Sequence, residues 1–250
     1  MRISVINLER SVERRQQMHA RLTALGLAHE FFAAIDAARG QLEGVSRYDE
    51  ARALRVLGQP LTPAEVGTFA SHYLLWQQCA RDGAARIVME DDLQVDPAFV
   101  DVVTAVSGGP LQRLGFVRLH GLSARQGRLQ VPLSGGYRLV RYAKGPRGAQ
   151  CYAISPEGAA ALVRGASVWV DAVDLYLDAF WLHGLASHAI EPYRVHHLDE
   201  SMAPSTIGSA RHAYRRTPRE KLRRELTHML WSLKRYWFNL RYRAPQFSGP

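Results

Sequence analysis

The sequence predicts an α/β protein with a largely parallel sheet flanked by helices. Short β-branched, apolar segments alternate with longer segments in which apolar residues recur every three to four positions, which is typical of strand–helix units. The composition is that of a globular protein, with 47% hydrophobic and 22% charged residues. The 250 residues can bury one sizeable core. A single α/β domain is therefore the expected arrangement.

The helix that begins after Thr62 carries the clearest local signals. Thr62 is an expected N-cap, Pro63 suits the first turn, and Glu65 completes a capping box. The polar segment 37–60 is expected to be irregular. In chain order we expect strands at 2–8, 30–35, 87–89, 116–119, 137–140 and 150–154, and helices from Ser11 to Gly26, from Thr62 to about Arg81, from Asp96 and from Ser155.

The net charge of +9 is confined to the C-terminal tail. Residues 211–250 hold eleven Arg and Lys against two acids, whereas residues 1–210 hold 21 basic and 21 acidic residues. We therefore divide the chain into a domain at 1–210 and a tail at 211–250. Apolar residues recur along this tail at three- and four-residue steps opposite its cations, which predicts a basic amphipathic helix. They are Leu222, Leu226, Met229, Leu230, Leu233, Trp237 and Leu240.

Three partners are open to such a helix: its own domain, a second chain, or an anionic membrane surface, which we favour. Nucleic acid is not expected, because no reader module precedes the basic residues. Isolated Cys79 and Cys151 predict neither a disulfide framework nor a zinc site. The short apolar run at the N-terminus predicts no signal peptide, and no segment is apolar enough to span a membrane. A cytoplasmic protein, peripheral on the membrane, is expected.

Three adjacent acids, Glu90, Asp91 and Asp92, directly follow the strand predicted at 87–89. Acids at i and i+2 along a strand end share one face, so Glu90 and Asp92 are expected to converge. Ligands of α/β sheets bind at the carboxyl ends of strands. A Mg²⁺ or Mn²⁺ ion on a substrate diphosphate needs only one or two protein carboxylates. The triplet is thus a candidate metal site, and a solvated turn is the alternative.

A series of short motifs follows in order along residues 1–208. They are VINL at 5–8 with Arg10, Arg14 and Arg15, AAID at 33–36, LTPAEVG at 61–67 with Ser71, His72 and Trp76, VMEDD at 88–92, AQCYAIS at 149–155 with Gly158, Val173-Asp174, and STI at 205–207. This ordered set resembles glycosyltransferase family 25, which includes lipooligosaccharide and collagen galactosyltransferases. The resemblance implies a GT-A-like, Rossmann-type fold.

The resemblance also implies a reaction: transfer of a sugar, usually galactose from UDP-galactose, to an acceptor hydroxyl with inversion. It implies a divalent metal, Mn²⁺ or Mg²⁺, with Asp92 as the leading ligand and Glu90 or Asp91 in support. Asp174 matches the family's acid and is the first candidate for the base, with Asp171 second. The implied donor-binding residues are Asn7, Arg10, Arg14, Asp36, His72, Ser205 and Thr206.

Structural alternatives stand beside several of these roles. A lone helical histidine such as His72 is often a packed structural residue, and Asp36 is equally consistent with a surface turn. Asp171, Asp174 and Asp178 share one face if their segment is helical, and a solvent-facing stripe gives the same pattern. The pair at 196–197 is interpreted as loop histidines, because no carboxylate follows at helical spacing.

The partners implied by the resemblance are a nucleotide sugar and a saccharide or glycolipid acceptor, in lipooligosaccharide, LPS or other surface-glycan assembly. A bacterial enzyme of this kind is expected on the inner face of the cytoplasmic membrane. The alternatives are a catalytically silent nucleotide-sugar-binding protein, a nucleic-acid binder and a metal-dependent phosphohydrolase. The donor, the acceptor and the linkage depend on pocket shape and are not fixed by the sequence.

Overall fold

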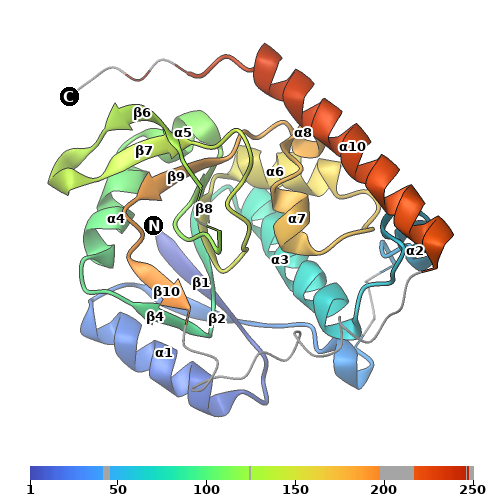
Figure 1. The fold of residues 1–250 in the computed structure, drawn as a ribbon. Coiled ribbons are helices and arrows are strands. Elements are labelled where there is room, and N and C mark those ends of the chain that lie inside the picture. Colours follow the sequence, from blue (N-terminus) through green and yellow to red (C-terminus); the bar gives the residue numbers. More distant parts are fainter. Residues whose placement is uncertain (42–45, 124, 198–216, 246, 248–250) are drawn as a thin grey trace.

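The computed structural model describes residues 1–41, 46–123, 125–197, 217–245 and 247. Its centre is a mixed sheet of eight strands in the order β2-β1-β3-β8-β5-β9-β7-β6 (Figure 1). Six of these strands point one way, and β8 and β7 run against them. The strands are β1 (Arg2–Asn7), β2 (His29–Ala33), β3 (Arg86–Glu90), β5 (Phe116–Arg118), β6 (Arg128–Pro132), β7 (Arg138–Arg141), β8 (Cys151–Ile154) and β9 (His188–Glu191).

Helices cover both faces of this sheet, which confirms the predicted α/β class. One face packs against α3, α6 and α7, and the other against α1, α4 and α5. Alternation along β3 sets the two layers: Val88 belongs to the first, and Ile87 and Met89 to the second. The helices are α1 (Val12–Ala24), α2 (Glu50–Leu57), α3 (Pro63–Asp82), α4 (Phe99–Ser107), α5 (Pro110–Leu114), α6 (Pro156–Gly165), α7 (Val173–Leu177), α8 (Phe180–His183) and α10 (Pro218–Arg241), with 3₁₀ turns η1 (Ala37–Arg39) and η2 (Ser134–Gly136).

Helix α3 is the longest element of the core, and its position depends on one glycine. The predicted capping box is present: the Thr62 side chain accepts from the Glu65 backbone, and the Glu65 carboxylate accepts from the Thr62 backbone at 2.8 Å. Gly67 lets the first turns approach the end of β2, because a Cβ at this position would lie 2.4 Å from the carbonyl oxygen of Ile35. Gly67 therefore lets α3 lie close to the carboxyl end of β2.

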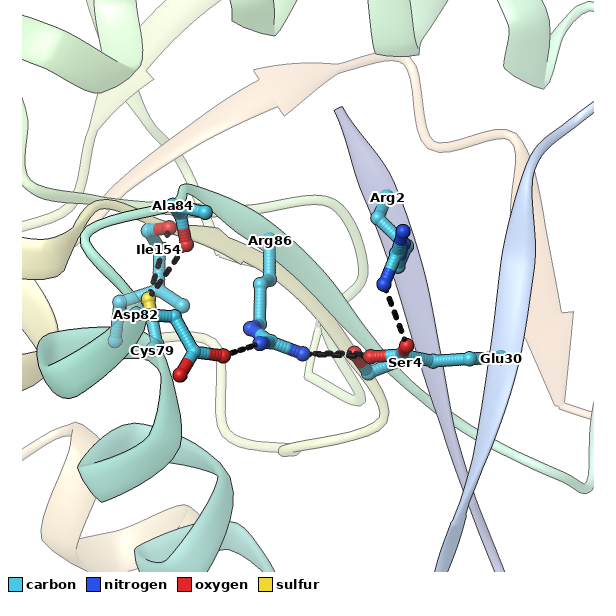
Figure 2. Close-up of polar contacts among 8 residues, drawn as sticks. All are labelled: Arg2, Ser4, Glu30, Cys79, Asp82, Ala84, Arg86 and Ile154. Carbon is cyan, nitrogen blue, oxygen red and sulfur yellow. Dashed lines mark hydrogen bonds and ion pairs between the residues drawn. The ribbon is translucent and has the colours of Figure 1, made fainter.

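A buried arginine joins the amino ends of β1, β2 and β3 (Figure 2). Arg86 is 5% exposed, donates to Glu30 at 2.6 Å and to Ser4 at 3.2 Å, and pairs on its other side with Asp82. Burial would raise the pKa of Glu30, but the hydrogen bonds from Ser4 and Arg2 and the charge of Arg86 lower it below its ordinary value. We call Arg86, Glu30, Asp82, Ser4 and Arg2 the arginine clamp.

Two local expectations need correction. Segment 37–60 is not wholly irregular, because α2 begins there with Asp49 as N-cap, its side chain accepting from the backbone of Arg52 at 2.8 Å. The histidine pair is not in a loop: it lies in β10 (Val195–His197), which pairs antiparallel with β4 (Leu93–Val95). Neither correction follows from local periodicity, since α2 is short and β10 is defined by a distant partner strand.

The C-terminal helix α10 lies along the outside of the domain beside α2 and α8 (Figure 1). Its contact face is the basic one: Arg224, His228, Trp231, Arg235 and Phe238 are half-buried. The Phe238 and Phe180 rings lie 4.9 Å apart, and the Asn239 amide donates to the Ala143 carbonyl at 2.9 Å. All seven residues of the apolar face that the sequence predicted are exposed, by 48–63%: Leu222, Leu226, Met229, Leu230, Leu233, Trp237 and Leu240.

We define these exposed residues as the outer apolar face. Helix α10 does dock on its own domain, one of the three expected arrangements, but through its basic face and not through the outer apolar face. No helix among the described residues is long and apolar enough to cross a membrane.

Candidate functional site

The three acids line a cavity at the carboxyl ends of β1 and β3. The cavity has a volume of about 390 Å³ and also takes residues from the end of β2, from α3 and from β10. Its wall unites much of the predicted set: Arg10, Arg14, Asp36, Glu90, Asp91 and Asp92. We call this cavity the acid pocket. The carboxyl-end placement was predicted from the strand pattern, and the fold satisfies it.

Asp91 is already engaged by protein donors. The Asn7 amide donates to its Oδ2 at 2.6 Å, and an Arg14 guanidinium nitrogen lies 3.4 Å from its Oδ1. Burial is the largest influence on Asp91 and raises its pKa, while the Asn7 hydrogen bond and the Arg14 charge oppose that shift. The Asn7 amide nitrogen thus has the partner that a buried donor requires, whereas its Oδ1 is buried without one among the described residues. These contacts hold the triplet in place.

Asp92 is left short of partners. Its Oδ1 is buried without a hydrogen-bond partner among the described residues, and its Oδ2 lies 3.5 Å from His197 Nε2. Burial first, and then the charge of Glu90, raise the pKa of Asp92. A buried carboxylate oxygen that faces a second carboxylate and lacks a donor is stabilised by a cation. These oxygens are of the kind that a hard divalent metal binds, and Asp92 and Glu90 would be the residues to hold one, although the described residues contain no cluster of three or more metal-ligating side chains.

His72 lies behind Glu90, fully buried. Its Nδ1 contacts the Tyr152 hydroxyl at 2.8 Å, which also accepts from the Trp76 indole at 2.7 Å. Its Nε2 lies 3.5 Å from Glu90 Oε1 but makes no hydrogen bond. With no exposed surface, His72 contacts the site through Glu90 rather than through the cavity. Trp76 is a fully buried core residue.

The opposite wall of the acid pocket carries the remaining donor-site candidates. Arg10 forms an ion pair with Asp36, whose side chain is 12% exposed, so Asp36 is a partly buried wall residue and not a free surface acid. Arg15 points elsewhere, with its guanidinium 4.7 Å from the Phe31 ring. Ser205 and Thr206 lie outside the described residues. Sequence reasoning did not select Gln150, whose Oε1 is buried without a partner in the described structure, or His197 as site residues.

The candidate bases lie in a different cavity, of about 560 Å³. The segment is not one continuous helix, because α7 covers only Val173–Leu177, so the condition for one shared helical face is not met. Asp171, Asp174 and Asp178 nevertheless line this cavity together. Asp178 is bound by Arg118 at 2.6 Å and by the Arg147 backbone N–H at 3.0 Å. The described linings of the two cavities share no residue, so the structure does not bring Asp174 to the acid pocket.

Fold and site together define a class: an α/β protein with helices on both faces of the sheet and a carboxylate pocket at the ends of its parallel strands. The family model described as glycosyltransferase family 25 (LPS biosynthesis protein) matches residues 1–177. The chain therefore belongs to glycosyltransferase family 25. The matched span contains Glu90, Asp92 and Asp174, and it ends before the predicted limit near residue 208.

Curated relatives agree with this assignment over a shorter segment. The chain is 37% identical over 106 residues to a "Glycosyltransferase 25 family member" of Anopheles gambiae, and 35% identical over 102 residues to one of Aedes aegypti. It is 32% identical over 106 residues to "Procollagen galactosyltransferase 1" of Danio rerio. Each match covers 39% of this chain but only 17% of the relative. The chain thus matches a minor part of these longer proteins.

Proposed function

We propose that the protein transfers a hexose, galactose from UDP-galactose, to a hydroxyl of a saccharide acceptor. The observation that carries the proposal is the Asp92 carboxylate, buried beside Glu90 with one oxygen lacking a partner among the described residues. Family membership supports sugar transfer, and the name of the Danio rerio relative supports galactose as the transferred sugar. In the reaction the acceptor oxygen bonds to the anomeric carbon, while the bond to the diphosphate breaks and UDP leaves with the electron pair.

Asp92 and Glu90 are the proposed holders of Mn²⁺ or Mg²⁺. Such a cation supplies neutralisation of the negative charge that develops on the departing diphosphate. Asp91 positions the triplet through its contacts with Asn7 and Arg14. Arg10 and Arg14 line the same cavity and would attract the anionic part of the donor, and Asp36 would accept hydrogen bonds from donor hydroxyls.

Asp174 remains the first candidate for the base that removes the acceptor proton, with Asp171 second. Inversion requires the base on the side of the sugar opposite the leaving diphosphate and within hydrogen-bond reach of the acceptor hydroxyl, so this role requires the acceptor to extend from the cavity that Asp174 lines to the donor in the acid pocket. Asp174→Asn is expected to lower kcat by roughly 10²-fold or more with little change in donor binding, which a steady-state assay would measure. An equal loss in donor affinity would instead place Asp174 at the donor.

The outer apolar face of α10 supports attachment to an anionic membrane. That face is exposed, and Lys234 and Arg241 lie on the same helix. A lipid-linked acceptor in LPS or other glycan assembly, on the inner face of a bacterial membrane, fits this arrangement. Co-sedimentation with phosphatidylglycerol vesicles but not with neutral vesicles is expected, and Leu230→Glu together with Leu233→Glu should abolish it.

The proposal is tested by a donor screen on the full chain. UDP-galactose, UDP-glucose, UDP-N-acetylglucosamine and GDP and CMP sugars are compared by thermal shift with and without Mn²⁺, and products are identified by mass spectrometry. A metal-dependent shift with UDP-galactose and a sugar–acceptor product are expected. Galactose 1-phosphate and UMP without any acceptor product would favour a phosphohydrolase. Binding without turnover would favour a silent nucleotide-sugar-binding protein.

A further inference from the structure

The second cavity, of about 560 Å³, brings together cations from two separate segments. Lys144 and Arg147 come from the segment that follows β7, and Arg224, His228 and Arg235 come from the half-buried face of α10. We call these five residues the cation cluster. Helix α10 is held against this wall by Asn239, which accepts from Arg141 at 2.5 Å and donates to Ala143. The cluster is therefore part of a cavity wall and not a spread of independent surface charges.

The cations of this cluster lie close enough to repel one another, as the direction of two pKa shifts indicates. Burial, and then Arg125, Arg235 and Arg147, lower the pKa of Lys144. Burial, and then the neighbouring arginines and Lys144, also lower the pKa of His228. Asp178, whose charge acts on Lys144 and Arg235, is itself bound by Arg118 at 2.6 Å. An anion in the cavity would relieve this repulsion.

The rest of the lining suits a sugar. The Trp181 and Trp231 rings, which lie 6.4 Å apart at 45°, line the cavity together with Asp171 and Asp174. Aromatic faces pack against the apolar faces of a sugar ring, and carboxylates accept hydrogen bonds from its hydroxyls. A bare inorganic anion would use neither feature.

We propose that this cavity binds an anionic saccharide, a sugar bearing a phosphate or carboxylate, and that the cation cluster on α10 and the segment after β7 recognises the anionic group. The inference rests on the proposed function, because it makes the cavity the acceptor site of the same reaction. It assigns α10 a second role: its half-buried face closes the acceptor cavity, while its outer apolar face points away from the domain.

The test uses the full chain and calorimetric titration with glucose 6-phosphate, glucuronic acid, methyl glucoside and inorganic phosphate. Both anionic sugars are expected to bind at least 10-fold more tightly than methyl glucoside and than phosphate. Arg235→Gln should weaken glucose 6-phosphate binding about 10-fold, the usual effect of losing one charge-assisted contact, while Arg235→Lys retains most of it. Arg164→Gln, which removes an exposed arginine of α6, serves as the matched control and should change nothing.

Equal binding of anionic and neutral sugars, or equal losses in Arg235→Gln and Arg164→Gln, would overturn the proposal. If inorganic phosphate binds as tightly as glucose 6-phosphate, the cavity recognises an anion but not a sugar, which contradicts the proposal of an anionic saccharide. Release of the chain from phosphatidylglycerol vesicles by glucose 6-phosphate would assign the cluster to a lipid headgroup instead. Donor binding in the acid pocket is measured in parallel with UDP and Mn²⁺. If the wild-type chain does not bind UDP with Mn²⁺, the proposed function alone is refuted. If Arg235→Gln binds glucose 6-phosphate as tightly as the wild type does, this inference alone is refuted.

Discussion

The two ends of the same three strands treat buried charge in opposite ways. At the amino ends of β1, β2 and β3, the arginine clamp surrounds Arg86 with the carboxylates of Glu30 and Asp82. At the carboxyl end of β3, Glu90 and Asp92 face one cavity, and an Asp92 oxygen lacks a partner in the described structure. A fold tolerates an incompletely compensated acid pair where a ligand supplies the missing charge. The contrast separates a structural end of the sheet from a functional one.

The largest expected effect is on catalysis at the carboxyl end. Asp92→Asn should lower kcat/KM for sugar transfer by roughly 10³-fold, because an amide oxygen carries no charge to hold a cation against the diphosphate. Urea unfolding should show no loss of stability, since an incompletely partnered buried charge is removed. Asp101→Asn, at an exposed position of α4, is the control and should retain full activity. If Asp92→Asn is less stable but turns over as fast as the wild type, Asp92 has a structural role, and the carboxyl end of β3 is not the functional end.

At the amino end the expected effect is on stability. Arg86→Met leaves Glu30 and Asp82 without their shared cation and should lower the free energy of unfolding by about 2–3 kcal/mol, less than for a fully enclosed pair because both acids are partly exposed. Urea titration measures this change. The folded fraction should keep its donor affinity, because the clamp lies at the far end of the strands. A selective loss of donor affinity would mean that the two ends are coupled.

A smaller effect is expected where α3 meets the site. Gly67→Ala places a Cβ 2.4 Å from the Ile35 carbonyl oxygen, so α3 must shift away from the end of β2. We expect a loss of about 1–3 kcal/mol in unfolding free energy, together with a higher KM for the donor, since Thr68 and Ser71 of α3 line the acid pocket. Gly26→Ala is a control for glycine loss away from the site, because no atom lies within 4 Å of a Cβ there, although its positive φ carries its own penalty. An unchanged KM in Gly67→Ala would contradict this reasoning.

The smallest effect is on pH dependence, and its sign differs between the two ends. The pKa of Asp92 is raised above 3.8, so this carboxyl disfavours folding at neutral pH, and the penalty fades as the pH falls through its raised pKa towards 3.8. The pKa of Glu30 is lowered below 4.5, so its contribution is complete above 4.5 and is lost as the pH falls through its folded-state pKa. With chelator present, the unfolding free energy of Asp92→Asn relative to wild type should increase as the pH rises towards neutral. That of Glu30→Gln relative to wild type should decrease over the same range. Parallel trends would count against the contrast.

Local patterns predicted the parts of this contrast that depend on neighbouring residues. Three features each depend on residues within a few positions of one another: the strand at 87–89, the acids after it and the capping box of α3. The arginine clamp and the contact between His197 and Asp92 were missed, because each joins segments far apart in the chain. The orientation of α10 was also undetermined, since its sequence has both an apolar face and a basic face, and only tertiary packing selects which one meets the domain.

The central claim is that the acid pocket beside Asp92 binds a metal-bound nucleotide diphosphate. Calorimetric titration of the full chain with UDP tests this claim most directly. We expect binding in the presence of Mn²⁺ that weakens at least 10-fold with chelator, and the same weakening in Asp92→Asn when Mn²⁺ is present. UDP binding that is indifferent both to Mn²⁺ and to Asp92→Asn would contradict the account.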